Sequence, residues 1–369
     1  MLLFQQNINI VKVFYQIIIL LLYLFIKFCY MKLFFTSIFS FFFLVQLTTG
    51  QDIHFSQFYA SPLTLTPANT GNYDGDWRIM NNYRRQWGSF SSPPIPYTTI
   101  SFGIDKSLYL RKDKLSFGFL ILNDESSTAE LAINKIFGSI AFHKILGNHS
   151  FNIGIQGGFV MKSVLPENLT FPNQFDNTTG YFNSDLSSGE TTVGEQISYM
   201  DLNAGISWSG KLGNFVPDVG ISLFHINQPK ESFLDKDNKL SMRKVIHAGG
   251  KYYIQSRYFI YPNFLLMEHS KASDMLVGSN FGYILPSEVS KVKNIFMGVY
   301  FRDGISRNPD SFIGVVGANL FNVDLGISYD FNVSDLKVAT NYKGGFEISL
   351  IYTVPSTKLT KITIPCDRF

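Results

Sequence analysis

The chain has 369 residues, of which 46% are hydrophobic, 16% aromatic and only 16% charged. Globular chains are typically about a quarter charged, so this many Phe and Tyr residues with so few charges fit an apolar surround better than water. Of the 31 Lys and Arg residues, three precede residue 51, where no acid occurs, and the rest equal the 28 acidic residues in number. A nucleic-acid-binding domain would present a basic face, so we expect no nucleic-acid partner.

The N-terminal part of the chain has the composition of a leader. A positive n-region at Met31-Lys32, a following apolar run and small residues before Gln51 come in the order of a secretory signal peptide. We therefore expect a leader over 1–50, with the signal peptide at 31–50 and 1–30 as an upstream extension. A double leader or an uncleaved anchor is the alternative. Export from the cytoplasm follows from the signal.

After the leader, apolar and small polar residues alternate with a period of two, which is typical of β-strands with two different faces. The clearest case is Thr98–Leu108, where Ile100 and Phe102 fall on one face while Ser101 and Asp105 fall on the other. Fourteen segments carry such a pattern: Trp77–Trp87, Thr98–Leu108, Lys114–Asn123, Leu131–Lys144, His149–Met161, Tyr199–Ser209, Phe215–His225, Lys244–Ile254, Phe259–Ser270, Asp274–Ile284, Ile295–Arg302, Ser311–Ala318, Leu320–Asp330 and Phe346–Tyr352.

These segments predict an all-β fold, a transmembrane antiparallel β-barrel of about fourteen strands over 77–352, followed by a C-terminal tail at 353–369. Most segments run about ten residues, the length of a tilted membrane-spanning strand. Counted in order, the even-numbered connections are short, with the exception of Leu285–Asn294, and every long loop is at an odd position. A barrel with both termini in the periplasm predicts this asymmetry. A secreted soluble β-protein is the alternative, and it requires none.

Between leader and barrel, the segment 51–76 is neither a strand nor a solvated linker. Pro62 and Pro67 remove backbone donors, which disfavours a central strand, while the apolar residues around them need somewhere to dock. We therefore predict a plug that folds back into the barrel lumen. A segment that projects into the periplasm and binds a partner is the alternative. The candidate plug residues are Phe55, Gln57, Phe58, Tyr59, Pro62, Pro67 and Ala68.

Motifs for catalysis or metal binding are not found. The six histidines have no metal-ligand spacing, and Asp235–Leu240 begins like a calcium loop but lacks the oxygen ligand and glycine that should follow. Cys366 is the one cysteine outside the leader, which leaves neither a disulfide framework nor a cysteine metal site. We therefore expect no catalytic, cofactor-binding or metal-binding residues, no cofactor, and a protein that is not an enzyme.

Several stretches of the chain together resemble one family, in order and at matching spacing. They are Gln51–Gly71 (with FSQFY, SPL and TPANTG), Asn82–Trp87 (NYRRQW), His225–Phe233 (HINQPKESF), Tyr329–Leu336 (YDFNVSDL), Gly345–Leu350 (GFEISL) and Pro365–Phe369 (PCDRF). They resemble the PorP/SprF family of type IX secretion system outer-membrane proteins of Bacteroidetes. Ser61 and Thr66 stand where that family usually has Asn, and the Pro-Cys-Asp order of the tail also departs from it.

The resemblance implies an integral outer-membrane β-barrel without enzymatic activity. Its implied partners are outer-membrane lipid, the type IX secretion machinery and a secreted surface adhesin, whose export or surface attachment, often for gliding motility, it would support. A barrel similar to fatty-acid transporters, passing small hydrophobic solutes, is the alternative. Long outer loops suit partner binding, although their aromatic residues could instead only fold the loops over the barrel mouth. The candidate partner-binding residues are Phe171, Phe175, Tyr181, Phe182, Gln228, Pro229 and Phe233.

Overall fold

The structure is a computed structural model that describes most of the chain from residue 53 onward. The described residues are 53–87, 96–110, 112–126, 131–164, 171–183, 185–187, 196–233, 238–270, 272–286, 291–305, 309–338 and 340–356. The leader, Gln51, Cys366 and nearly all of the tail therefore lie outside the described residues.

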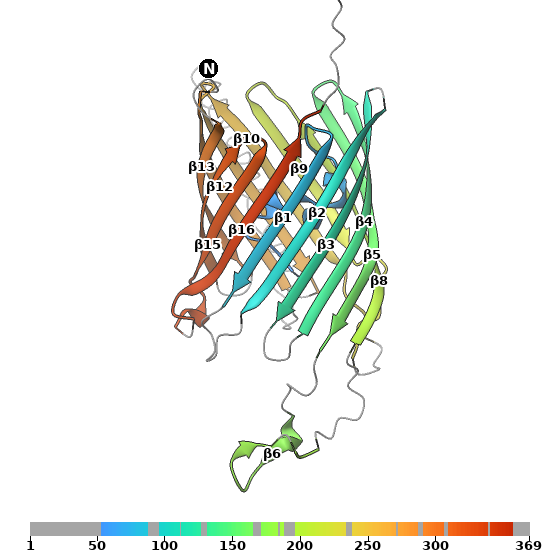
Figure 1. Cartoon of the computed structure of the whole chain (residues 1–369), viewed down its shortest axis with the longest axis vertical. Helices are drawn as coiled ribbons and strands as arrows, with labels where there is room; N and C mark the ends of the chain where they lie inside the picture. Colours follow the sequence, from blue (N-terminus) through green and yellow to red (C-terminus); the bar gives the residue numbers. More distant parts are fainter. Residues whose placement is uncertain are drawn as a thin grey trace, which may run out of the picture. The chain divides into compact units, whose positions relative to one another are not determined.

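The fold is a closed barrel of fourteen antiparallel strands, in which each strand pairs with the next one along the chain and β1 pairs with β16 (Figure 1). All fourteen predicted segments are confirmed as barrel strands, and β16 extends to Val354. The barrel strands are β1 (Trp77–Gln86), β2 (Tyr97–Leu110), β3 (Asp113–Ser126), β4 (Leu131–Leu146), β5 (His149–Ser163), β8 (Gln196–Gly210), β9 (Phe215–Phe224), β10 (Arg243–Ile254), β11 (Tyr258–His269), β12 (Ala272–Ile284), β13 (Val292–Asp303), β14 (Pro309–Leu320), β15 (Val323–Asn332) and β16 (Lys343–Val354).

Several short elements complete the described part of the chain, and none of its helices is long and apolar enough to cross a membrane. Three of these elements precede the barrel, one hairpin with its helical turn belongs to the long connection between β5 and β8, and one turn precedes β16. They are η1 (Phe58–Ala60), α2 (Pro62–Leu65), η2 (Pro67–Asn69), η4 (Pro172–Gln174), β6 (Phe175–Asp176), β7 (Tyr181–Phe182) and η5 (Asp335–Lys337).

The two ends of the barrel differ in the length of their connections, as the sequence predicts. Tight turns join β4 to β5 at Gly147-Asn148 and β14 to β15 at Phe321-Asn322, and we call this the short-turn end. The long connections, between β5 and β8 and between β9 and β10, lie at the opposite, long-loop end. The chain enters β1 and leaves β16 at the short-turn end, because Trp77 pairs with Val354.

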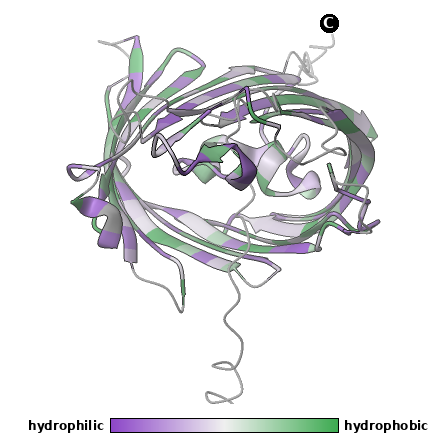
Figure 2. Ribbon diagram, turned by 90° about the horizontal axis from the view of Figure 1, so that it is seen from below, coloured by the Kyte–Doolittle hydropathy of each residue, from purple (hydrophilic) through white to green (hydrophobic). Residues whose placement is uncertain are grey.

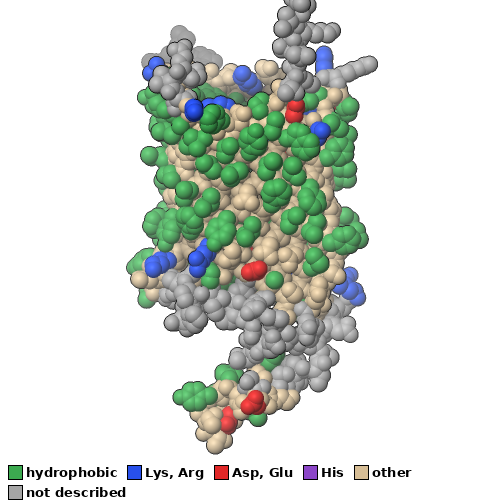
Figure 3. All heavy atoms as spheres, viewed as in Figure 1, with side chains coloured by type: hydrophobic (Ala, Val, Ile, Leu, Met, Phe, Trp, Pro, Cys, Tyr) green, Lys and Arg blue, Asp and Glu red, His purple; other side chains and the backbone are tan. Residues whose placement is uncertain are grey.

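The two faces of the wall follow from the period-two pattern. On β5, Phe151, Ile153 and Ile155 are 50%, 58% and 61% exposed, whereas Asn152 and Gln156 are each 3% exposed. Side chains alternate across a strand, so the apolar set points outward and the polar set into the lumen. Figure 3 shows the outward set as a belt of hydrophobic side chains on the face in view, with Lys, Arg, Asp and Glu gathered near its two edges.

The sequence pattern suggests a lumen face of small and polar side chains throughout, but the structure differs from this expectation. Leu120 and Leu122 on β3 and Phe137 on β4 point inward and are about as buried as core residues, at 4%, 4% and 5% exposure. They lie where the N-terminal segment packs against the wall. Side chains therefore alternate between inward and outward along each strand, as predicted. The polarity of the inward side chains, however, depends on whether they contact the lumen segment.

The outward face predicts a measurable cost for a charge. Phe119 lies in the middle of β3 and is 41% exposed, so Phe119→Arg should lower the free energy of unfolding in lipid vesicles by about 2–4 kcal/mol. Urea titration of the refolded barrel measures the change, with Phe119→Leu as a control. Asp324→Arg puts the same charge on the lumen side of β15 and should cost much less. Equal losses for both Arg variants would contradict the assignment of faces.

Candidate functional site

The candidate functional site is the N-terminal segment inside the barrel, residues 53–76, which we call the lumen segment. Figure 2 looks along the barrel and shows its short helical turns enclosed by the ring of strands. The carbonyl of Ile53 accepts a hydrogen bond from Arg243, at the long-loop end of β10, at 3.3 Å. The amide of Gly71 donates to Asp105 on β2, toward the short-turn end, at 2.7 Å. The segment therefore runs along the lumen from the long-loop end to the base of β1.

A buried ionic cluster holds the outer part of the lumen segment at Ser56. The Ser56 hydroxyl lies 2.9 Å from both carboxylate oxygens of Asp330 and accepts hydrogen bonds from Arg84 and Arg302 at 2.6 and 2.5 Å. The backbone amides of Ser56 and Gln57 donate to the two carboxylate oxygens of Glu347, each at 2.8 Å. One serine of the segment thus contacts four charged side chains of the wall.

The charged side chains of this cluster also pair with one another. Arg84 lies 2.8 Å from Asp330 and 3.2 Å from Glu347, while Arg302 lies 3.1 Å from Asp330 and 3.2 Å from Asp310. Arg84, Asp330 and Glu347 are at most 3% exposed. Burial of charges is costly unless each one is paired and its remaining hydrogen-bonding capacity is used. The lumen segment supplies the donors and the acceptor that complete this pairing.

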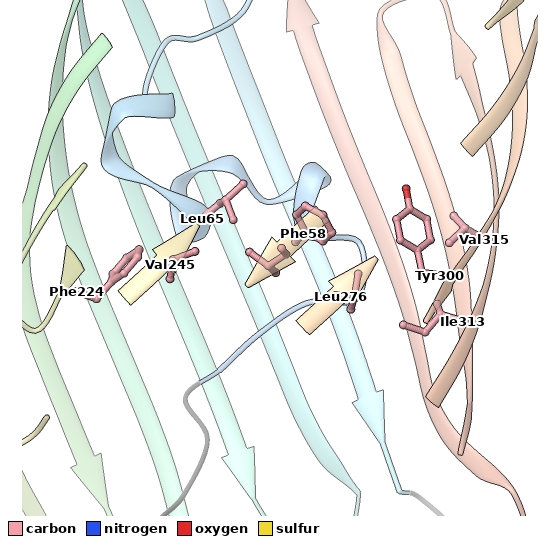
Figure 4. Close-up of a cluster of buried hydrophobic side chains, with 9 residues drawn as sticks. Phe58, Leu65, Phe224, Val245, Leu276, Tyr300, Ile313 and Val315 are labelled. Carbon is pink, nitrogen blue, oxygen red and sulfur yellow. The ribbon is translucent and has the colours of Figure 1, made fainter. Parts of the chain in front are cut away.

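An apolar layer forms the middle of the contact between the lumen segment and the wall. Phe58 and Leu65 pack among inward-facing side chains of β9 to β14, as Figure 4 shows. Leu63 packs into a second cluster, whose wall residues come from β1, β3, β4 and β5. Burial of side chains of this size stabilises a structure by about 1.5–3 kcal/mol each. The wall residues are Phe224, Val245, Leu265, Leu276, Tyr300, Ile313 and Val315 in the first cluster and Met80, Leu120, Phe137 and Val160 in the second.

A second polar anchor lies near the short-turn end. Asp105 accepts the amide of Gly71 and also a bidentate pair of bonds from Arg78, at 3.1 and 2.6 Å. The Lys114 ammonium donates to the carbonyls of Gly71 and Tyr73 at 2.5 and 3.2 Å. The lumen segment is therefore tied to the wall by charged groups at both of its ends, with apolar contacts between them.

At one position of the barrel wall, the lumen segment lies so close that only glycine leaves enough room for it. A Cβ atom on Gly154 of β5 would lie 2.4 Å from the carbonyl carbon and oxygen of Pro67. This distance is shorter than any van der Waals contact, and the obstacle is backbone. Gly154 therefore lets the η2 turn of the segment approach the sheet directly.

The structure brings the predicted plug residues together in the lumen. Phe55, Gln57, Phe58, Pro62, Pro67 and Ala68 are all buried there. Tyr59 is half-buried and stacks on Tyr300 with ring centroids 5.8 Å apart. Whether this arrangement closes the barrel to solutes is a question of function, which we take up below.

The predicted loop residues divide into exposed and covered ones. Phe175 and Phe182 pair edge to face across the β6–β7 hairpin at 5.3 Å, and both stay largely exposed, as does Tyr181 at 77%. Phe171 is half-buried. The hairpin turn is built by Asp176, whose pKa is held below its usual range because the Thr178 amide and the Thr179 hydroxyl donate to its carboxylate.

The second predicted loop begins with a tight turn after β9. His225 has a positive φ of 58° and its ring bonds to Asp201 at 2.9 Å, which holds the turn against β8. Gln228 is exposed, Pro229 is buried and Phe233 is half-buried. Of these three residues, Gln228 alone is exposed.

Six charged residues of the wall were not among the predicted site residues: Arg78, Arg84, Asp105, Arg302, Asp330 and Glu347. A signal was present, because each of them falls on the inward face of its strand, where a charge needs a partner. Three of them also stand inside the stretches that carry the family resemblance, namely Arg84, Asp330 and Glu347. Among the described residues, no group of His, Cys, Asp or Glu side chains is placed to hold a metal ion.

The ionic cluster predicts a large loss of stability from a single neutralisation. Asp330→Asn keeps the side-chain size but leaves Arg84 and Arg302 short of a counter-charge, so the free energy of unfolding in lipid vesicles should fall by about 3–5 kcal/mol. Glu268→Gln is the control, because its pair with Lys244 is more than half exposed on both sides and should contribute about 1 kcal/mol at most. Urea titration measures both, and similar losses would contradict the central role of Asp330.

The barrel with its lumen segment is similar to known proteins in both sequence family and fold. The chain resembles solved outer-membrane barrels at low identity. The CymD monoaromatic hydrocarbon channel has a TM-score of 0.47 at 10% identity, with coverage of 80% of this chain and 93% of that one. The P. putida toluene transporter TodX has a TM-score of 0.43 at 8% identity, with coverage of 79% of this chain and 93% of that one. BamA from Haemophilus ducreyi has 0.40 at 10%, covering 75% and 70%. No curated protein sequence matches the chain.

The family model gives the assignment. The model for the type IX secretion system membrane protein PorP/SprF matches residues 47–352, which include the lumen segment and nearly the whole barrel. With the closed barrel of fourteen strands, this match identifies an outer-membrane β-barrel. The chain belongs to the PorP/SprF family of type IX secretion system membrane proteins.

Proposed function

We propose that this protein is a non-enzymatic partner of the type IX secretion machinery that supports the export and surface attachment of a large adhesin, including adhesins used in gliding. In this proposal the long-loop end faces the outside of the cell, where the adhesin is held. The protein acts through its surfaces and leaves the passage of the secreted chain to other components.

One observation supports this proposal above the others, namely the way the lumen is filled. The lumen segment is bonded to the wall by the Ser56 cluster near one end and by Asp105 and Lys114 near the other. A polypeptide passing through the lumen would have to displace both anchors and expose the paired charges. A barrel filled in this way is suited to binding at its mouths.

The β6–β7 hairpin is the part of the long loops that best fits a partner surface. Exposed aromatic side chains are enriched among residues that dominate binding energy, and Phe175, Tyr181 and Phe182 are all exposed beyond 40%. The alternative role, in which these rings only fold the loop, accounts for the Phe175–Phe182 contact but gives Tyr181 no function.

Passage of small hydrophobic solutes is the second candidate function. The observation that favours it is a hollow on the short-turn side of the lumen segment, with a volume of about 1080 Å³. This function does not need the loop aromatics, so loop variants separate it from adhesin attachment.

We predict that the double variant Tyr181→Ala/Phe182→Ala reduces the adhesin displayed on the cell. Each truncation of a hot-spot residue costs about 2 kcal/mol or more, which is roughly 30-fold in affinity. Antibody labelling of intact cells measures the adhesin, and immunoblots of outer membranes confirm equal amounts of barrel. Leu186→Ala, an exposed aliphatic residue of the same connection, is the matched control. Normal display in the double variant would remove the hairpin from the partner surface.

We also predict that the lumen segment acts as a plug. Deletion of 53–70 should convert the purified barrel into an ion-conducting pore in planar bilayers, because a lumen of fourteen strands is too wide for wall side chains to fill. Heat-modifiable migration on gels confirms that the deleted form still folds. Unchanged low conductance in a folded deletion variant would favour the alternative, in which the segment serves mainly to bind a periplasmic partner.

A further inference from the structure

The short-turn half of the lumen contains two chambers that meet at the same residues. The larger one, of about 1080 Å³, is lined by short-turn ends of the strands, and a side chamber of about 180 Å³ lies toward β12 to β16. Tyr59, Lys251 and Tyr261 line both. A cavity of about 150 Å³ is large enough to hold a benzene ring, so the side chamber can take a small organic group.

At the junction of the two chambers, the Lys251 ammonium faces aromatic rings. Lys251 Nζ lies 4.7 Å from the ring centroid of Phe259 and 5.5 Å from that of Tyr261. Within the described part of the chain it has neither a hydrogen bond nor an ion pair. Ring faces attract a cation, but they offer no acceptor lone pairs to its three N–H donors.

Four other cations of the lumen have partners within the described residues. Arg84 and Arg302 belong to the Ser56 cluster, Arg78 is paired with Asp105, and Lys114 donates to two carbonyls. The carboxylate of Asp324 lines the same side chamber as Lys251, but it is exposed and accepts a hydrogen bond from Asn319 at 2.6 Å. Charges away from bulk water are normally paired. Of these five lumen cations, Lys251 is therefore the one that is suited to bind an external anion.

The walls around Lys251 define the rest of such a ligand. Phe259 and Phe296 bring aromatic rings to the side chamber and Ile351 brings an aliphatic group, while Ser349 and Asn294 add polar atoms. A ligand with its anionic head at the junction would therefore place an apolar tail of about five to seven carbons in the side chamber. The larger chamber provides its path from the short-turn end.

We propose that Lys251 and the side chamber form a binding site for a small amphipathic monocarboxylate, with the carboxylate on the Lys251 ammonium and an aliphatic or aromatic tail against Phe259 and Phe296. This site is separate from the loop surface of the proposed adhesin role, and it gives the solute function a definite ligand chemistry. Binding at the site requires no movement of the Ser56 cluster.

The test uses the mature chain in lipid nanodiscs, free of detergent because detergents are themselves amphipathic. Isothermal titration with hexanoate and phenylacetate should show saturable binding. Hexanol and hexylamine, which match hexanoate in tail length but lack its negative charge, should bind at least about tenfold more weakly. Equal binding of hexylamine, or no binding of either carboxylate, would overturn the proposal.

Variants locate the site. Lys251→Met should weaken hexanoate binding at least about tenfold, while Lys251→Arg, which keeps the charge, should stay within a few fold of the wild type. Lys211→Met is the matched control, because Lys211 lines the larger chamber only and is exposed. Ile351→Trp should abolish binding by filling the side chamber with no change in charge. Unchanged affinity in both Lys251→Met and Ile351→Trp would overturn the assignment, and loop variants should leave hexanoate binding unaffected.

Discussion

The pairing of buried charges around Ser56 is the constraint on which the rest of the structure depends. Four charged side chains from β1, β13, β15 and β16 converge on the hydroxyl and amide of one serine that precedes the barrel in sequence. Without the lumen segment, Arg84, Arg302, Asp330 and Glu347 would face a wide aqueous lumen, where their pairing would contribute little. With the segment in place they are buried, so every missing partner is costly.

This constraint couples the folding of the lumen segment to closure of the barrel. Arg84 stands on β1 and Glu347 on β16, and they are opposite partners in the pairing that closes the sheet. Ser56 binds next to that closing seam, so the segment and the last strand complete the same cluster. We infer that the segment is a structural part of the barrel rather than a removable attachment. In the function we propose, such a barrel works through surfaces at its mouths, and the space that the segment leaves open lies on the short-turn side.

The fold could be predicted from the sequence because the two faces of each strand contact different environments, lipid on the outside and the lumen on the inside. Apolar residues such as Phe151 alternate strictly with polar residues such as Asn152. This alternation predicts both the strand and the face of it that contacts lipid. The pattern is weaker at Leu120-Ile121-Leu122, where both faces are apolar because the lumen segment packs on the inner one. The β6–β7 hairpin was missed because two-residue strands carry no periodic signal.

The candidate site was only partly predictable, for a different reason. The need of the N-terminal segment for an apolar environment is visible in Phe55, Phe58 and the prolines. The partners of Ser56 are not, because they lie 28 to 291 residues away in sequence and meet only when barrel register is known. An inward charge such as Arg302 indicates that a partner exists, but a single sequence does not tell which of the other strands supplies it.

Hydrogen–deuterium exchange of the intact protein in lipid bilayers tests the central claim most directly, because it needs no variant. The amides of Ser56 and Gln57, bonded to Glu347, and those of the η1 to η2 turns should exchange as slowly as the amides of β1 and β16 if the segment and barrel form one cooperative unit. Rapid exchange of residues 56–70 while the barrel strands stay protected would contradict the account, since it would show a segment that leaves the lumen freely.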